Sequence, residues 1–393
     1  MQIDVTDLVR ELWPLHQIYT NAKSDLRLVG GCVRDTIMGR TCEDIDLATP
    51  MLAADGMSLL QQHGYSCEST GLEHGVFTVS INNRQYEIAT LRIDVETDGR
   101  RARCEFTTDW SLDAARRDLT INALYADFEG KVTDYVGGLD DLQKGLIQFC
   151  GEPRQRISED YLRILRFYRF MGLFELEPNA DTEAALIQAA PMLTTLSIER
   201  RHQELVKILA SPNPCRAMGL MDKHRALEYV VGSYDIDRFK RYVEAEAAVG
   251  LTRSWCVRLL ALTASADAAL ERSTKRQMQS IQKLYLDPLF ERPTYFYHAS
   301  LVQVDTVIDA VLVKYASTSD GCSIEYLGEI IRELRDLQVP VFPIKGTDLI
   351  KLPIPRSSYG CILDRCRRFW AADCYRPDHD ACLEYIMSTL SQP

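Results

Sequence analysis

The chain of 393 residues is long enough for roughly two to four domains, and its 46% hydrophobic and 26% charged residues are typical of a globular protein without a membrane span. A formal net charge of −11, taken alone, argues against nucleic acid as a partner, but binding depends on local patches of Lys and Arg. The twelve cysteines form no C-x-x-C pair and the N-terminus has no secretory signal, so we expect a cytoplasmic protein without a disulfide framework or a zinc site.

The first ~150 residues have a mixed pattern of strands and helices. The apolar run "LRLV" ends at Gly30-Gly31, and the next segment predicts a short helix. "DIDLA", "VFTVSI" and "QYEIATLR" alternate polar and apolar residues as half-buried strands do, and "INALYAD" predicts a further strand. Asn82-Asn83, between two of these runs, is typical of a tight turn.

From residue ~150 onward the spacing of apolar residues favours helices. "SEDYLRILRFYRFMG" and "SIERRHQELVKILASPNP" are periodic in this sense, with Ser158 and Ser197 at predicted N-cap positions. The remainder is mostly helical and is interrupted by loops that contain proline. The predicted fold class is therefore α+β, with a mixed head followed by an elongated helical portion.

Asp44 and Asp46 form a D-x-D pair shortly after the two glycines. Residues two apart on a strand project from the same face, so these carboxylates would lie side by side and repel unless a cation lies between them. Oxygen ligands at this spacing suit Mg²⁺. The alternative interpretation is a polar strand face at the domain surface.

The turn before this pair favours a phosphate site. A strand that ends in Gly30-Gly31 and opens a helix presents backbone N–H groups, and Arg34 on the first helical turn can add a charge-assisted contact. Glycines alone would indicate only a tight turn. Glu87 in "QYEIATLR" could complete a metal site if its strand lies beside that of Asp46, and is otherwise a glutamate that faces solvent.

Asp160, Arg163, Arg166 and Arg169 are spaced three apart, so on a helix they form one slowly turning stripe. We expect apolar residues such as Ile164 to pack on the opposite side. Such a stripe is usually a charged solvent face of an amphipathic helix. Three arginines with only one acid nearby make this stripe a little unusual for such a face.

Five motifs occur in order along the chain and together resemble the bacterial-type (class II) tRNA nucleotidyltransferases, or CCA-adding enzymes, and the related bacterial poly(A) polymerases: "GGCVRD…EDIDLAT", "RRDLTINALYAD", "DYVGGLDDL", "EDYLRILRFYRF" and "ERRHQELVKIL". The resemblance is strong over residues ~30–210 and weaker in the C-terminal third. There, "KGTDLIKLPIP" and "CILDRCRRFWAADCYRPDHDACLEYI" are still similar to the family's tail.

The resemblance implies a polymerase-β-like nucleotidyltransferase head that uses CTP and ATP to add C, C and A to the tRNA 3′ end without a template, with two Mg²⁺ ions. It implies four regions: a head at 1–148, a neck at 149–215, a body at 216–290 and a tail at 291–393. The helical C-terminal part is expected to bind the acceptor and T arms of the tRNA.

The resemblance also implies roles for individual residues. These are Asp44 and Asp46 as ligands of Mg²⁺, Gly31 and Arg34 at the triphosphate, Arg117 and Asp118 at the ribose and phosphates, and Asp160, Arg163, Arg166 and Arg169 at the base and triphosphate. Glu87 stays a candidate third catalytic carboxylate.

A pairing of Asp160 and Arg163 with the base would explain the choice of C and A. Both bases offer an exocyclic amino donor beside a ring-nitrogen acceptor, whereas U and G offer the opposite order. An ionised aspartate only accepts hydrogen bonds and an arginine only donates them. With U or G, like groups would face each other in a dry site, which discriminates strongly.

Three alternatives to full CCA addition stay open. The segment "RIDVETDGRRARCEF" at 92–106 resembles a loop that enzymes restricted to CC addition lack, which points to CCA addition or to A addition alone; Asp98-Gly99 would otherwise indicate an ordinary hairpin.

A poly(A) polymerase would usually have a longer basic C-terminal region. A tRNA-binding protein without activity would have lost one metal ligand, and the isolated pair His379-Asp380 gives no support to a phosphohydrolase.

Overall fold

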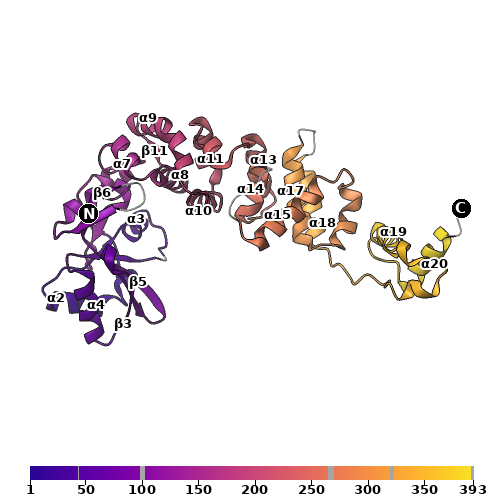
Figure 1. The fold of residues 1–393 in the computed structure, drawn as a ribbon, viewed down its shortest axis with the longest axis horizontal. Helices are drawn as coiled ribbons and strands as arrows, with labels where there is room; N and C mark the ends of the chain where they lie inside the picture. Colours follow the sequence, from indigo (N-terminus) through magenta and orange to yellow (C-terminus); the bar gives the residue numbers. More distant parts are fainter. Residues whose placement is uncertain (43, 98–101, 264–269, 319–322, 391–393) are drawn as a thin grey trace. The chain divides into compact units, whose positions relative to one another are not determined.

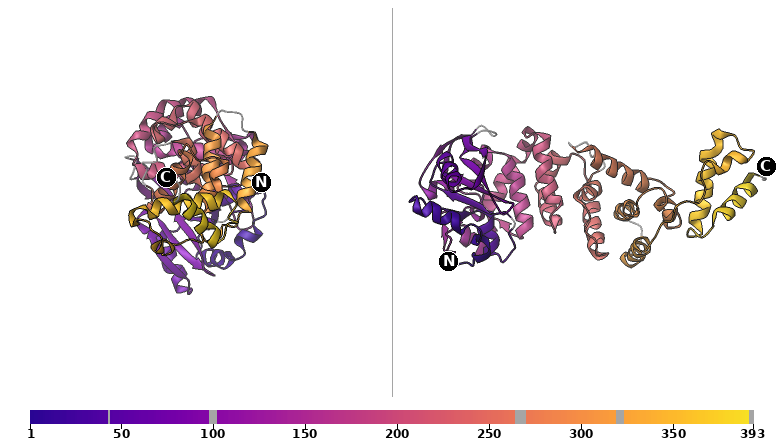
Figure 2. Two further views of the ribbon diagram at one scale, coloured as in Figure 1. Left: turned by 90° about the vertical axis from the view of Figure 1, so that its right-hand side faces the viewer. Right: turned by 90° about the horizontal axis from the view of Figure 1, so that it is seen from below.

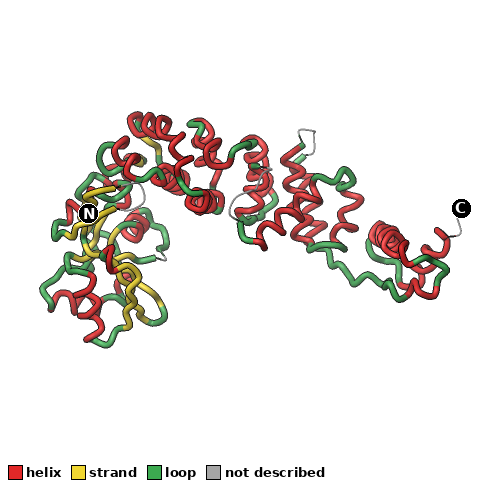
Figure 3. Tube along the Cα trace, in the orientation of Figure 1, coloured by secondary structure: helices red, strands yellow, loops and turns green. Residues whose placement is uncertain are grey.

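The computed structural model describes residues 1–42, 44–97, 102–263, 270–318 and 323–390. The chain divides into two compact units, Met1–Val230 and Val231–Pro393. All strands among the described residues belong to the first unit, and the elements of the second are helical (Figures 1 and 3). The predicted fold class, a mixed head followed by a helical portion, is therefore confirmed.

The first unit contains the following strands: β1 (Arg27–Val29), β2 (Asp46–Thr49), β3 (Ser66–Gly71), β4 (Val76–Ile81), β5 (Arg84–Thr90), β6 (Arg92–Thr97), β7 (Ala102–Phe106), β8 (Leu124–Ala126), β9 (Val132–Asp134), β10 (Leu146–Ile147) and β11 (Glu177–Pro178). Its helices are α1 (Thr6–Val9), α2 (Trp13–Asn21), α3 (Gly31–Ile37), α4 (Ala53–Gln62), α5 (Trp110–Ala115), α6 (Gly138–Lys144), α7 (Pro153–Glu159), α8 (Leu162–Phe174), α9 (Ala180–Ala189), α10 (Ile198–Leu209), α11 (Pro214–Lys223) and α12 (Ala226–Val231), with the 3₁₀ turns η1 (Leu72–His74), η2 (Thr120–Asn122) and η3 (Ala190–Thr195).

A seven-stranded sheet in the order β3-β4-β5-β2-β1-β8-β9 forms the centre of the head. β2 and β5 run parallel, and the other neighbours are antiparallel. Because side chains alternate along a strand, Leu28 and Leu47 enter the core that also contains α2 and α4, whereas Val29 and Ala48 enter a second core beside α5. The sheet is therefore covered on both faces.

The local predictions for the head hold, apart from the segment "INALYAD" and the first two residues of "DIDLA", which precede β2. β1, α3 and β2 lie where the pattern places them, and Asn82 and Asn83 have φ angles of 50° and 64°, as a tight hairpin turn between β4 and β5 requires. "INALYAD" was expected to be one strand, but it begins in the turn η2, and β8 starts only at Leu124. The alternation of this segment is too short to reveal the 3₁₀ turn.

The helical part of the first unit corrects the prediction at Ser158. Ser197 caps α10 by accepting a hydrogen bond from the backbone N–H of Arg200, as predicted. Ser158 lies inside α7, whose N-cap is Glu152, and the chain is extended at Asp160 before α8 begins. Asp160 thus stands between two helices, and the predicted four-residue stripe starts on α8 only at Arg163.

The second unit consists of helices joined by loops: α13 (Ile236–Ala248), α14 (Trp255–Leu262), α15 (Arg272–Tyr285), α16 (Tyr295–Ala299), α17 (Val304–Ser317), α18 (Ile324–Arg335), α19 (Tyr359–Ala372) and α20 (His379–Leu390), with η4 (Arg292–Thr294), η5 (Asp348–Lys351) and η6 (Arg356–Ser358). α17 packs against α13, α14 and α15, where a buried ion pair joins Glu246 to Arg258 at 2.8 Å. α19 and α20 enclose a separate small core around Trp370, seen at the C-terminal end of the chain in Figure 2.

Candidate active site

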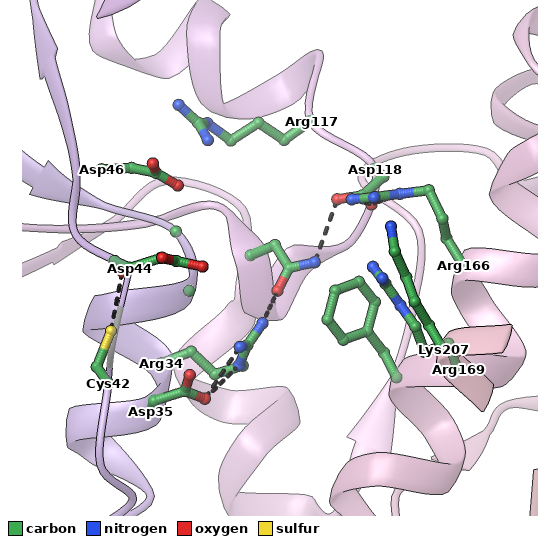
Figure 4. Close-up of a pocket in the computed structure, with 14 residues that line it drawn as sticks. Arg34, Asp35, Cys42, Asp44, Asp46, Arg117, Asp118, Arg166, Arg169 and Lys207 are labelled. Carbon is green, nitrogen blue, oxygen red and sulfur yellow. Dashed lines mark hydrogen bonds and ion pairs between the residues drawn. The ribbon is translucent and has the colours of Figure 1, made fainter. Parts of the chain in front are cut away.

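A cavity of about 530 Å³ in the first unit collects most of the predicted site residues (Figure 4). Eight of them line it: Gly31, Arg34, Asp44, Asp46, Arg117, Asp118, Arg166 and Arg169. Figure 4 places Asp44 and Asp46 on the head side, opposite Arg166, Arg169 and Lys207 from the helices α8 and α10. Two carboxylates thus face a group of cations across one polar cavity.

The carboxylate pair lies at the start of β2. Asp46 is the first residue of the strand and Asp44 lies two residues before it, so the strand geometry predicted for both applies only to Asp46. Burial raises the pKa of Asp46, Arg117 lowers it and the neighbouring Asp44 raises it again. A carboxylate that is costly to ionise beside a second carboxylate fits a hard cation, and Mg²⁺ typically takes one or two protein carboxylates and completes its shell with water and phosphate oxygens.

Glu87 lies one strand further along the sheet. β5 runs parallel to β2 with Glu87 in register with Asp46, so the two strands are neighbours as the prediction required. Burial and Asp46 both raise the pKa of Glu87. Its side chain does not line the cavity, in contrast to Asp44 and Asp46.

The glycine turn positions Arg34. Gly30 has a φ of +76°, a conformation that L side chains rarely adopt, and its backbone N–H is used by β8. α3 starts immediately afterwards, so Arg34 lies one turn into the helix. The guanidinium of Arg34 pairs with Asp35 at 2.9 Å and lies 4.3 Å from the ring centre of Phe174, which fixes its orientation.

A chain of hydrogen bonds crosses the cavity from the head to α8. Arg34 donates to the side-chain oxygen of Asn122, the Asn122 amide nitrogen donates to Asp118 at 3.3 Å, and Arg166 donates to the other oxygen of Asp118 at 2.6 and 2.8 Å. Burial opposes ionisation of Asp118, but Arg166 and the hydrogen bonds outweigh it and lower the pKa. Asp118 is therefore ionised at neutral pH.

Arg117 is fixed by residues that lie outside the cavity lining. Its Nη2 lies 3.1 Å from the carboxylate of Asp113, and Tyr125 donates to the same carboxylate oxygen at 2.6 Å. Asp113 is 1% exposed and also pairs with Arg116 at 2.7 Å. Two cations and a phenol around one buried carboxylate fix the position of Arg117 at the cavity wall.

A second buried carboxylate supports the opposite wall. Glu204 of α10 is 4% exposed, accepts from Lys207 at 3.0 Å and lies 3.4 Å from Arg169. The guanidinium of Arg169 is 4.5 Å from the ring centre of Phe170, which also lines the cavity. α8 and α10 thus contribute a rigid cationic wall.

Asp160 and Arg163 do not line the cavity and are not paired with each other. Asp160 accepts two hydrogen bonds from Arg200 of α10, at 3.0 and 3.1 Å. Arg163 pairs with Glu159 and donates to the backbone oxygen of Arg156 at 2.7 Å. Ile164, which was expected on the opposite side of α8, is fully buried.

The sequence interpretation missed five side chains of the cavity: Asp35, Cys42, Asn122, Phe170 and Lys207. Asn122, Phe170 and Lys207 lie inside motifs that the resemblance uses. The spacing of residues in the sequence does not reveal the contact of Asn122 with Arg34, which lies 88 residues away.

The segment 92–106 forms the hairpin β6–β7, and the backbone N–H of Arg92 donates to Asp113 at 3.2 Å. This bond ties the hairpin to the carboxylate that holds Arg117. The predicted turn at Asp98-Gly99 lies outside the described residues.

Other site chemistries find no support among the residues that the structure describes. Among them, no group of three or more His, Cys, Asp or Glu side chains could hold a metal ion by itself. Within the same residues, no helix is long and apolar enough to cross a membrane.

Comparison with known proteins identifies the same family as the sequence motifs. A family model of the poly(A) polymerase head domain matches residues 26–148, and one described as a probable RNA- and SrmB-binding site of polymerase A matches residues 174–234. The chain is 32% identical to CCA tRNA nucleotidyltransferase 1, mitochondrial, of Danio rerio over 96% of this chain and 90% of that protein, and 31% identical to the Homo sapiens protein of the same name over 95% and 89%.

Solved structures agree with the fold. The Bacillus stearothermophilus CCA-adding enzyme in complex with CTP has a TM-score of 0.73 at 23% identity and covers 97% of both chains. The sequence relatives, which align over nearly the whole chain, decide the family. The chain belongs to the family of the CCA tRNA nucleotidyltransferases and related poly(A) polymerases.

Proposed function

We propose that the chain adds C, C and A to the 3′ end of tRNA, using CTP and ATP and releasing pyrophosphate. The observation that supports this most directly is the cavity in which Asp44 and Asp46 face the cations of α3, α8 and the loop before η2. The reaction requires a negatively charged triphosphate to lie beside a pair of metal-binding carboxylates, and this cavity offers both environments.

Asp44 and Asp46 are proposed as the ligands of two Mg²⁺ ions, with Glu87 as a third catalytic carboxylate. Bound Mg²⁺ lowers the pKa of the attacking 3′-hydroxyl and neutralises charge on the leaving pyrophosphate. The chain's own contribution is positioning, because β2 fixes Asp46 and the buried β1–β2 pair supports it. The carboxylate oxygens of Asp44 and Asp46 are ligands that suit Mg²⁺ and do not suit a soft metal ion.

The cations would hold the triphosphate, with Gly31 allowing its close approach. Arg34, Arg117, Arg166 and Arg169 each have a protein partner that fixes the guanidinium without covering all five of its donors. Charge-assisted hydrogen bonds from such preset groups are strong and need little reorganisation when the substrate binds.

We propose that Asp160 and Arg163 read the base. Asp160 accepts hydrogen bonds from Arg200, and the exocyclic amino group of C or A is a donor that could replace it. Arg163 pairs with Glu159, and the ring nitrogen of C or A is an acceptor that could replace that carboxylate. Binding of the nucleotide would then turn both side chains away from these partners and toward the cavity.

The proposed roles of the head, neck, body and tail follow the boundaries predicted from the sequence. We propose that the head (1–148) and neck (149–215) perform the transfer, and that the body (216–290) and tail (291–393) bind the acceptor and T arms. The hairpin β6–β7, present here, favours addition of the terminal A. Addition of A alone and poly(A) synthesis are the competing activities.

The compartment is a separate proposal. The free cysteines suit a reducing compartment, and we propose the cytoplasm, although relatives from animals bear the name mitochondrial. Fractionation of the source cells with an antibody against the chain would decide between the two.

The experiment uses tRNA transcripts that end before CCA, after C and after CC, each with one nucleotide at a time. We expect CTP to extend the first two and ATP only the third. ATP addition to the third transcript without any CTP addition would establish the A-adding activity instead, and long A tails on any RNA would establish a poly(A) polymerase.

A further inference from the structure

Asn122 occupies the middle of the hydrogen-bond chain that joins Arg34 to Arg166. It lies in the turn η2, is 8% exposed and lines the cavity between Gly30 and Asp118. None of the roles described above uses it. Its side chain nevertheless contacts one group proposed for the triphosphate, Arg34, and one proposed for the ribose, Asp118.

Both ends of the Asn122 amide are used, each in the only direction that its chemistry allows. The oxygen accepts from Arg34, which can only donate, and the nitrogen donates to the Asp118 carboxylate, which can only accept. An aspartate at this position would keep the acceptor for Arg34 and lose the donor, and an alanine would lose both. The two contacts can therefore be separated by substitution.

Asp118 is fixed at both oxygens. One accepts from Asn122 and from the backbone N–H of Leu119 at 2.9 Å, and the other accepts two hydrogen bonds from Arg166. Without Asn122, the first oxygen would keep only the backbone bond and could rotate away. In a nucleotide the covalent structure limits the distance between the ribose hydroxyls and the phosphates, so the spacing of Asp118 and Arg34 must fall within that range.

We propose that Asn122 is a positioning residue that holds Asp118 and Arg34 at the spacing of the ribose and the triphosphate, and thereby sets the preference for ribonucleotides over deoxyribonucleotides. This inference rests on the proposed function. A merely structural role for Asn122, as part of the packing of η2, would change stability and leave the choice of sugar as it is.

The test compares kcat/KM for ATP and dATP on a tRNA transcript that ends in CC, for the wild-type chain, Asn122→Ala and Asn122→Asp. The loss of a hydrogen bond to a charged group changes a binding or rate constant by about tenfold. We therefore expect the ratio of kcat/KM for ATP to kcat/KM for dATP to fall about tenfold in both variants. KM for both nucleotides should rise more in Asn122→Ala, which also loses the contact with Arg34.

Asn179→Ala is the matched control. Asn179 caps α9 by accepting from the N–H of Thr182, far from the cavity lining, so its loss should lower the melting temperature without changing the sugar preference. A sugar preference within twofold of wild type in both Asn122 variants, with a lowered melting temperature, would overturn the inference. If Asn122→Ala does not fold, the nearly isosteric Asn122→Asp decides.

Failure of the proposed function would look different, because the wild-type chain would then not extend the transcript at all. In that case the ratio of the dissociation constants for ATP and dATP, measured by calorimetry without RNA, gives the same comparison. A ratio that falls in the Asn122 variants supports the inference, and an unchanged ratio contradicts it.

Discussion

At the scale of single residues, the position of each cavity cation depends on a carboxylate. Arg117 depends on Asp113, Arg166 on Asp118 and Arg169 on Glu204. Two of these carboxylates, Asp113 and Glu204, are almost fully buried and outside the cavity lining. A buried carboxylate is costly unless it is paired with a cation. Each of these carboxylates therefore holds its arginine in a fixed position.

Asp113 gives the first prediction. Burial opposes its ionisation, but Arg117, Arg116 and the hydrogen bonds outweigh burial and lower its pKa below 3.8. A lowered folded-state pKa stabilises the fold above the unfolded-state pKa, and this contribution disappears as the pH falls through the folded-state value. Asp113→Asn should therefore lower the free energy of unfolding by about 3 kcal/mol at pH 7, since it leaves two partly buried guanidinium groups without a counter-charge.

The pH dependence tests the cause of this loss. The difference between wild type and Asp113→Asn in urea unfolding should shrink as the pH falls from 3.8 through the lower folded-state pKa, because the wild-type carboxyl binds a proton first in the unfolded chain and then in the folded chain. A difference that stays constant down to acid denaturation would mean that shape, and not charge, is responsible.

The carboxylates at the start of β2 give the second prediction. Asp44→Ala should reduce nucleotide transfer by about a thousandfold or more, because preset ligands of the catalytic cations are lost. Glu87→Gln should reduce transfer by about a hundredfold, less than Asp44→Ala, since Glu87 is proposed as a third catalytic carboxylate but does not line the cavity. Circular dichroism should show both variants folded, and an active Asp44→Ala would refute the metal assignment.

At the scale of elements, the break between α7 and α8 matters most. The extended backbone at Asp160 turns its carboxylate toward Arg200 of α10, so that three helices meet around the proposed base-reading pair. A continuous helix from Ser158 would instead have placed Asp160 in line with Arg163. The break therefore decides what Asp160 contacts.

Asp160→Ala is the third prediction. It should raise the use of UTP and GTP relative to CTP and ATP before it abolishes transfer, because the acceptor that rejects carbonyl oxygens is gone. Misincorporation on transcripts ending before CCA and in CC measures this. Arg200→Ala should leave the nucleotide choice largely intact, and unchanged selectivity in Asp160→Ala would refute the reading role.

Local patterns predicted the elements of the head because these depend on neighbouring residues. The alternation of β4 and β5, the Asn82-Asn83 turn and the cap at Ser197 all follow from short-range chemistry. The pairing of Asp160 with Arg200, 40 residues away, does not. The same holds for Asp118 and Arg166, which α8 brings together over 48 residues.

At the scale of the whole molecule, a chain with a net charge of −11 must bind RNA through local cations. Arg365 of α19 and Lys345, in the preceding loop, are both exposed in the second unit. They belong to the segment that resembles the family's tail. We therefore propose that this region of the second unit binds the tRNA body.

The fourth prediction reverses these charges. Arg365→Glu with Lys345→Glu should raise KM for tRNA several-fold and flatten its salt dependence by roughly one unit of slope per lost phosphate contact, with KM for CTP unchanged. Lys23→Glu with Lys131→Glu, which reverses two exposed lysines of the head, serves as the charge-matched control. Equal effects of the tail and head variants would contradict the assignment.

The most direct test of the whole account is to sequence the 3′ ends that the full chain produces on tRNA transcripts lacking CCA, with all four nucleoside triphosphates present at equal concentration. The account predicts that the products end in CCA and that growth then stops. Transcripts that stay unextended, that gain U or G, or that grow into A tails would contradict it.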